Sequence, residues 1–142
     1  MSEQVTRVSA YALCREADAL LLSRIAPGAT VSSDGMWTLP GGGLGFGEDP
    51  RDAALRELAE ETGLVGEITE LAGVDSWSGP IGTVDYHAIR IIYRVHITGG
   101  ELTNEADGSS DLATWVPLTE LAAMPLVDLA RVGARLAGVP IQ

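Results

Sequence analysis

Apolar and polar residues alternate most regularly between Thr83 and Ile97, where apolar side chains recur at nearly every second position. A period of two is typical of a β-strand that packs one of its faces against other residues. Shorter apolar runs, bounded by polar residues, glycine or proline, predict four further strands. These strands are expected at Val5–Arg15, Ala19–Arg24, Glu67–Val74 and Ala113–Pro117.

A helix is predicted over Pro50–Thr62, because residues at both of its ends mark a helix start and a helix stop. Proline suits the first turn of a helix, where its missing N–H costs no hydrogen bond, and Asp49 before it suits the N-cap. Gly63 is a natural residue at which a helix ends. The side of this helix that is expected to pack on a sheet carries Leu55, Leu58, Ala59 and Thr62.

Two more helical segments are expected after the last strand, a short one at Leu118–Ala123 and a closing helix at Val127–Ala137. The resulting order of strands, helix, strands and helix predicts an α/β fold, in which a mixed β-sheet carries helices on both faces. The chain has 142 residues, enough for one domain with a sizeable core, and we expect a single domain over residues 1–142.

The predicted helix concentrates three carboxylates on one face. Glu57, Glu60 and Glu61 stand at positions i, i+3 and i+4, which lie within an arc of roughly 100°. They repel one another, and they lie near the helix C-terminus, where the helix dipole disfavours anions. A hard divalent cation such as Mg²⁺ would relieve both costs. Glu60 and Glu61 are expected to point away from the core; the alternative interpretation is a solvated acidic helix face.

The segment Gly42–Leu64 supplies a more specific pattern than the helix alone. Its fixed positions resemble the Nudix hydrolase signature, G-x5-E-x7-R-E-U-x-E-E-x-G-U with U aliphatic, at all nine positions. The preceding Trp37-x-Leu-Pro-Gly-Gly is also the usual approach to that signature. The resemblance implies a Nudix-type α/β/α sandwich with a mixed β-sheet. It also implies hydrolysis of a nucleoside diphosphate linked to another group, with water attacking phosphorus and Mg²⁺, or Mn²⁺ in its place, as cofactor.

The resemblance further assigns roles within this segment. It implies that Glu57, Glu60 and Glu61 are metal ligands, that Glu57 or Glu60 also positions or deprotonates water, and that Glu48 holds a second metal. The carbonyl of Gly41 is expected to bind a metal as well. Arg56 is expected to orient Glu57 through a charge-assisted hydrogen bond rather than to touch the substrate.

Residues outside the helix are candidates for binding the substrate. Glycines such as Gly42 let the backbone come close to a ligand. By resemblance, Arg24 faces the substrate's phosphates, although a surface arginine at a strand end is an equal alternative. Pro80 stands sixteen residues beyond Leu64 in an expected Gly-Pro turn, as in ADP-ribose pyrophosphatases of the family. Trp77 is expected either to stack on the base or to pack in the protein.

The resemblance leaves two questions open. Many family members place a carboxylate before the last strand, but Glu105, Asp107 and Asp111 are not clearly in register with that pattern, so the general base is not identified. The favoured substrate is ADP-ribose or a related nucleotide sugar. The alternatives are a nucleoside triphosphate pyrophosphohydrolase that clears oxidised nucleotides, and a catalytically silent module that binds a nucleotide.

Composition narrows the possible partners. The net charge is −11 and all nine basic residues are arginine, which argues against a nucleic-acid surface and fits a small anionic nucleotide that arrives with metal ions. No apolar run approaches the roughly 20 residues of a membrane span, and the N-terminal segment lacks the plan of a signal peptide. Cys14 is the only cysteine. We therefore expect a cytoplasmic enzyme without membrane contact. The resemblance to small Nudix pyrophosphatases, which are often homodimers, further implies a homodimer, in which pairing would cover exposed apolar strand surface.

Overall fold

The computed structural model of the chain describes residues 3–28, 33–106 and 108–142. No helix in these ranges has the length and apolar composition needed to cross a membrane. The elements, in chain order, are β1 (Glu3–Leu13), β2 (Arg15–Glu16), β3 (Ala19–Ile25), β4 (Trp37–Thr38), β5 (Gly41–Gly43), α1 (Pro50–Thr62), β6 (Leu64–Ile81), β7 (Val84–Gly100), β8 (Ser110–Pro117), the 3₁₀-helix η1 (Leu118–Ala123) and α2 (Asp128–Leu136).

The described strands form two four-stranded sheets. The first has the order β5-β1-β7-β6, and the second joins β2, β3 and β4 with β8 paired on β3. β1 runs parallel to β7 and antiparallel to β5, so the first sheet is mixed, as the sequence predicts. The Ala12 N–H of β1 donates at 2.9 Å to the carbonyl of Pro40, which lies in the link between β4 of the second sheet and β5 of the first. The expected strands are therefore present, but they divide between two sheets.

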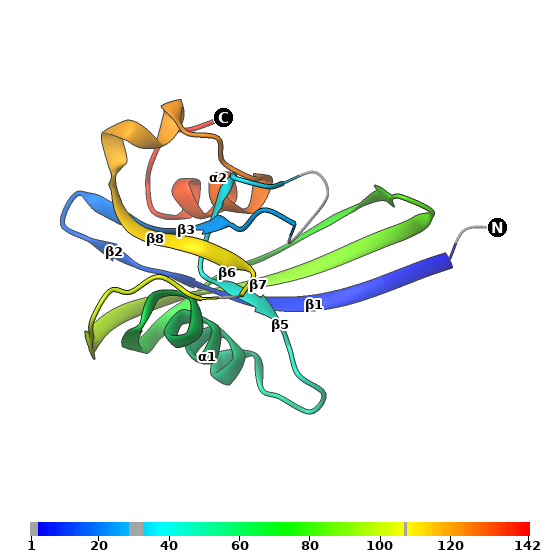
Figure 1. Cartoon of the computed structure of the whole chain (residues 1–142), viewed down its shortest axis with the longest axis horizontal. Coiled ribbons are helices and arrows are strands. Elements are labelled where there is room, and N and C mark those ends of the chain that lie inside the picture. The colour runs from blue at the N-terminus through cyan, green and yellow to red at the C-terminus, as the bar shows by residue number, and fades with distance from the viewer. Residues whose placement is uncertain (1–2, 29–32, 107) are drawn as a thin grey trace.

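The two helices cover opposite sides of the strands (Figure 1). Successive residues of a strand point to opposite faces, so β1 and β3 each contribute to two separate cores. On one side Ala12 and Leu21 pack with Leu58 of α1, whereas on the other Leu20 and Leu22 pack with residues of α2. This arrangement confirms the predicted α/β/α layering.

The structure confirms the residues predicted to begin and end α1. The side chain of Asp49 accepts a hydrogen bond from the backbone N–H of Arg51 at 2.9 Å, and Gly63 ends the helix with a left-handed φ of 76°. The packed side of the helix, however, is turned relative to the prediction. Its buried residues are Ala53, Ala54, Leu58, Glu61 and Thr62, whereas Ala59 is exposed. The expectation that Ala59 packs on the sheet is wrong, because the contact is centred on Ala54 and Leu58.

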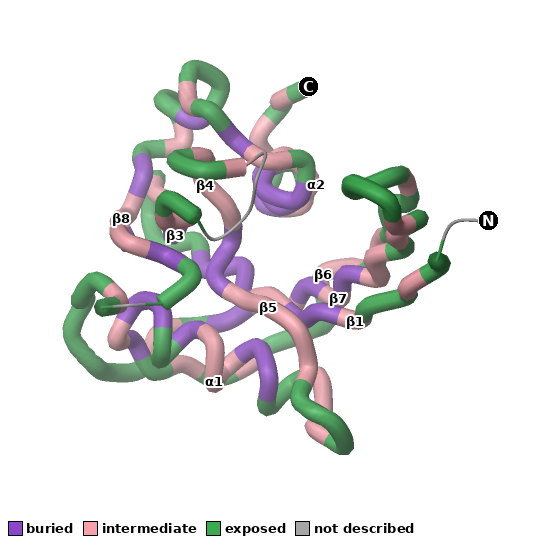
Figure 2. Tube along the Cα trace, turned by 45° about the vertical axis from the view of Figure 1, so that its right-hand side comes forward, coloured by how far each residue is buried: buried purple, intermediate pink, exposed green. Residues whose placement is uncertain are grey.

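The hairpin of β6 and β7 is longer than the sequence pattern predicts, with 18 and 17 residues. Its tip extends beyond α2 and is largely exposed (Figures 1 and 2). Ile81 pairs with Val84, so the turn consists of residues 82–83, and Pro80 lies within β6 opposite Asp85. The expected turn at residues 78–80 is therefore wrong. Proline is tolerated there because β6 is the edge strand of its sheet and needs no outward N–H bond.

Candidate active site

A polar cleft of about 390 Å³ opens where β1, β3, β5 and α1 meet. The glycine triplet of β5 forms one wall, and the carboxylates of Glu57 and Glu61 on α1 lie within the same cleft. β1 and β3 contribute further polar side chains. These are Arg7, Ser9, Tyr11 and Ser23, with Tyr86 and Ser110 from β7 and β8.

Glu61 is the buried member of the acidic face. Its residue is only 3% exposed, and its carboxylate accepts hydrogen bonds from Ser23 Oγ and from the Gly41 N–H, each at 3.2 Å. The expectation that Glu61 points away from the core is therefore wrong. Because α1 packs through Leu58, the side chain three positions later turns inward between β3 and β5.

Burial also sets the protonation of Glu61. Removal from water, and then the neighbouring carboxylate of Glu57, raise the pKa of Glu61 well above its usual range. A carboxyl with such a pKa holds a proton at neutral pH. Glu61 is therefore protonated in the metal-free protein.

Glu57 lies against the glycine wall. A Cβ atom added to Gly42 would lie 3.0 Å from Cδ and Oε1 of Glu57, so a side chain at this position would press on the carboxylate. The side chain of Glu57 is 16% exposed. It therefore remains open to the cleft, whereas Glu61 lies deeper.

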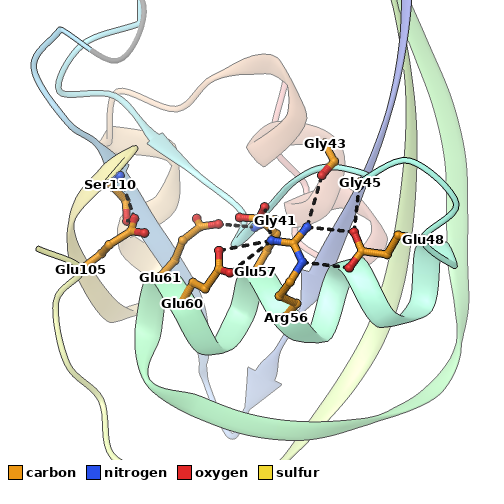
Figure 3. Close-up of polar contacts among 10 residues, drawn as sticks. All are labelled: Gly41, Gly43, Gly45, Glu48, Arg56, Glu57, Glu60, Glu61, Glu105 and Ser110. Carbon is orange, nitrogen blue, oxygen red and sulfur yellow. Dashed lines mark hydrogen bonds and ion pairs between the residues drawn. The ribbon is translucent and has the colours of Figure 1, made fainter. Parts of the chain in front are cut away.

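Arg56 holds the remaining carboxylates of the signature together (Figure 3). Its guanidinium donates to both oxygens of Glu48, at 2.8 and 2.9 Å, and to Glu57 at 3.1 Å. It also lies 3.3 Å from Glu60, whose side chain is 49% exposed. The hydrogen bonds from Arg56 lower the pKa of Glu48 to about 2. The expected contact between Arg56 and Glu57 is present, and it belongs to a larger ion-pair network.

The lining of the cleft indicates which carboxylates could hold a cation there. Within residues 3–28, 33–106 and 108–142, no three Asp, Glu, His or Cys side chains converge as a metal site. Glu57 and Glu61 are the carboxylates that line the cleft, whereas Glu48 and Glu60 are not among its lining residues. Carboxylate oxygens are the ligands that Mg²⁺ prefers, and a bound cation would neutralise the negative charge of these two carboxylates once Glu61 loses its proton. Glu57 and Glu61 therefore fit a cation, and Gly41 lines the same cleft.

The loop carboxylates have separate partners. Asp111 forms a bidentate ion pair with Arg24 at 2.8 Å, and the Arg24 guanidinium lies 5.9 Å from the ring centroid of Trp37. Glu105 accepts hydrogen bonds from the N–H and Oγ of Ser110, at 3.2 and 3.1 Å, and Ser110 lines the cleft. Asp107 lies outside the described residues.

The cleft contains only some of the predicted substrate residues. Gly42 lines it, whereas Arg24, Trp77 and Pro80 are not among its lining residues. Trp77 is 39% exposed on β6, beside a second cavity of about 470 Å³ that Ser78 and Gly79 line. Tyr86 lines both cavities.

Sequence reasoning missed the residues that β1 contributes to the cleft. Arg7, Ser9 and Tyr11 occupy alternate positions of β1 and therefore share a face. The signal was present, since three polar or aromatic residues recur with period two in an apolar strand. It became interpretable only once the neighbours of β1 were known, because β5 and β7 lie far from it in the sequence.

The family model of the NUDIX domain matches residues 4–135. The chain belongs to the Nudix family. Members of this family generally use divalent metal ions. The match spans the cleft, both helices except the last residue of α2, and every strand except the first residue of β1.

Curated Nudix relatives match parts of the chain. One is "Putative 8-oxo-dGTP diphosphatase 2" of Mycobacterium tuberculosis, 40% identical over 94 residues, or 66% of this chain and 62% of that protein. Another is "ADP-ribose pyrophosphatase" of Methanocaldococcus jannaschii, 40% identical over 68 residues, or 48% of this chain and 39% of that protein. The chain thus spans less than two thirds of the length of either relative.

A solved Nudix structure shares the fold over almost the whole chain. The crystal structure of a "MutT NUDIX hydrolase" from Burkholderia pseudomallei aligns with a TM-score of 0.76 at 23% identity. The alignment covers 93% of this chain and 98% of that one. At this identity the likeness supports the architecture alone.

We expect Glu61→Gln to change how the stability of this Nudix domain depends on pH. The raised pKa of Glu61 means that the folded state keeps its proton while the unfolded state loses it. The contribution of Glu61 to the free energy of unfolding is fully present below the ordinary glutamate pKa of about 4.3. It declines as the pH rises above that value. The glutamine amide stays neutral, accepts from the Gly41 N–H and donates to Ser23 Oγ.

Urea unfolding in EDTA between pH 5 and 8 measures this effect. The stability of the variant relative to the parent should rise with pH, by at most about 1.4 kcal/mol per pH unit. Glu60→Gln is the control, because Glu60 is exposed. Parallel stability curves for the parent and Glu61→Gln would mean that Glu61 is ionised in the folded protein.

Proposed function

We propose that this chain hydrolyses the pyrophosphate bond of a nucleoside diphosphate derivative, with Mg²⁺ or Mn²⁺ as the cation. One observation carries the proposal: the carboxyl pair of Glu57 and Glu61 lies in a cleft whose facing wall is the glycine backbone of β5. Such a wall admits phosphate groups close to the main chain, and the carboxyl pair suits a cation beside them.

The residues of the chain have distinct parts in this reaction. Glu57 and Glu61 would hold the cation, and the hydrogen bonds from Ser23 Oγ and the Gly41 N–H keep Glu61 in place. Arg56 orients Glu57 through its 3.1 Å hydrogen bond. When bound, the cation neutralises the phosphate oxygens during the attack of water on phosphorus.

ADP-ribose or a related nucleotide sugar is the proposed substrate. Two cavities, of about 390 and 470 Å³, meet at Tyr86, which suits a molecule with a bulky group on each side of a diphosphate. Trp77 and Pro80 flank Ser78 and Gly79 of the second cavity along β6, although neither lines either cavity. The Methanocaldococcus jannaschii relative named ADP-ribose pyrophosphatase lends support.

A nucleoside triphosphate is the second candidate. The Mycobacterium tuberculosis relative, named a putative 8-oxo-dGTP diphosphatase, matches 66% of this chain, whereas the ADP-ribose pyrophosphatase matches 48%. A triphosphate has one bulky end, and it would leave the second cavity unfilled.

Steady-state kinetics with Mg²⁺ separates the candidates. We expect ADP-ribose to yield AMP and ribose phosphate, with a kcat/KM at least equal to that of 8-oxo-dGTP and ordinary triphosphates. A triphosphate preferred by about a hundredfold would overturn the nucleotide-sugar assignment and leave the pyrophosphohydrolase standing. No turnover of any nucleotide would mean that the proposed function is wrong and that the chain only binds its ligand.

Removing either carboxyl of the pair should abolish most of the activity. Glu57→Gln and Glu61→Gln keep the side-chain shape but remove the charge that attracts the cation, so each should lower kcat by at least about a hundredfold. Mg²⁺ should raise the melting temperature of the parent more than that of either variant.

Glu67→Gln is the matched control, since Glu67 is an exposed glutamate on β6 outside the cleft. It removes the same charge and should leave both kcat and the Mg²⁺-induced rise in melting temperature unchanged. Folded Glu57→Gln and Glu61→Gln variants with full activity would place the cation elsewhere.

We also propose that the chain forms a homodimer. In the described part of the chain, β6 is an edge strand, and it exposes Leu71, Val74 and Ile81 to between 54 and 59%. A second copy would cover these apolar side chains and the open strand edge. Light scattering at micromolar concentration should give twice the monomer mass of 14.9 kDa. A monomer mass would refute the assembly.

A further inference from the structure

The cleft contains one arginine that the proposed reaction has not used. Arg7 lines it from β1, on the strand face that it shares with Ser9 and Tyr11. It lies in the same cleft as Glu57 and Glu61, and its side chain is exposed. A cation on the wall of an acidic cleft is suited to an anionic ligand that enters there.

Arg7 differs from most arginines of the chain in its partners. Five of the nine arginines form ion pairs with acidic side chains: Arg24, Arg51, Arg56, Arg90 and Arg94. Across the described ranges, Arg7 forms neither a salt bridge nor a side-chain hydrogen bond, so its donors are available. Arg131 on α2 is likewise without a salt bridge in those ranges, but it lies outside the cleft.

Each glycine of β5 lies against a charged group of the cleft. The Gly41 N–H donates to Glu61, and Gly42 lies against Glu57. A Cβ atom at Gly43 would lie 2.6 Å from Nε and 2.8 Å from Cζ of Arg7, so the guanidinium rests on Gly43. Successive residues of a strand point to opposite faces, so Arg7 and Glu57 approach β5 from different sides. Both nevertheless line the same cleft, together with Glu61.

The position of Arg7 also fits the path of a longer substrate. Tyr86, which lines both cavities, pairs in register with Val5, two residues before Arg7 on β1. The second cavity continues along the same end of β1, where Gln4, Val5 and Thr6 line it. Arg7 therefore stands between the carboxyl pair and the cavity available to the rest of the molecule.

We propose that Arg7 binds the phosphate next to the one that is attacked. This inference rests on the proposed function and adds a specificity-determining residue to it. The guanidinium offers two parallel N–H donors to the oxygens of one phosphate, a geometry that an ammonium group does not reproduce. It holds that phosphate against Gly43 while the neighbouring phosphate lies beside Glu57 and Glu61.

Kinetics on the intact chain tests the role. An interaction present before and during the reaction changes KM and leaves kcat alone. Arg7→Gln should therefore raise KM for the best substrate at least about tenfold and keep kcat within about threefold. Arg7→Lys should recover part of the loss. Arg131→Gln removes the same charge outside the cleft and should match the parent.

Gly43→Ala provides an independent variant. The three atoms nearest to the added methyl group all belong to the side chain of Arg7, so the substitution should displace the guanidinium and raise KM as Arg7→Gln does. The melting temperatures of all four variants should stay near that of the parent. An Arg7→Gln variant with unchanged KM, or with reduced kcat at unchanged KM, would overturn the proposal.

Binding of methylenediphosphonate measures the same contact without turnover. This pyrophosphate analogue has a bridging carbon that is not hydrolysed, and calorimetry with Mg²⁺ gives its affinity. Arg7→Gln should bind it at least about tenfold more weakly than the parent and Arg131→Gln. Equal affinity in Arg7→Gln, or no binding to the parent, would refute the role of Arg7. A parent that binds the analogue but hydrolyses no nucleotide would refute the proposed function alone.

Discussion

The burial of the Glu61 carboxyl is the constraint on which the cleft depends. A carboxyl taken out of water is costly unless its oxygens have hydrogen-bond partners. Here those partners come from Ser23 on β3 and Gly41 on β5, while Leu58 anchors α1 to the same sheets. One side chain therefore ties a helix and two strands together at the site. The hydrogen bonds that place an acidic group in the cleft are therefore the same ones that help to hold α1 against β3 and β5.

Local signals in the sequence predict the elements but not their orientation. Asp49, Pro50 and Gly63 mark the ends of α1, because each residue has an intrinsic reason to stand where it does. The burial of Glu61 has no such local cause. An arc of three glutamates shows that they share a face, but only contacts with strands distant in the sequence decide which member of that face turns inward.

The same distinction explains the error at the hairpin and the missed part of the site. Glycine and proline at residues 79–80 have the composition of a turn, and the edge position that makes Pro80 acceptable within β6 is a property of the sheet. Arg7 belongs to the cleft because Ser9 pairs with Gly43 and because Val5 pairs with Tyr86. The signature spacing identifies the carboxylates, whereas strand pairing determines what surrounds them.

The parallel pairing of β1 with β7 has a consequence for how the cleft is assembled. Ser9 lies opposite both Gly43 and Arg90, so β1 is the central strand that joins an early and a late part of the chain. Contacts between residues so far apart in sequence require a large loop to close before they stabilise anything, which slows folding. Until β7 takes its place, β1 presents an open edge, and the early half of the chain is vulnerable to pairing with other molecules. β1, which carries Arg7 into the cleft, is thus protected from pairing with other molecules only after β7 has been synthesised. β7 is the last strand of this sheet in the sequence.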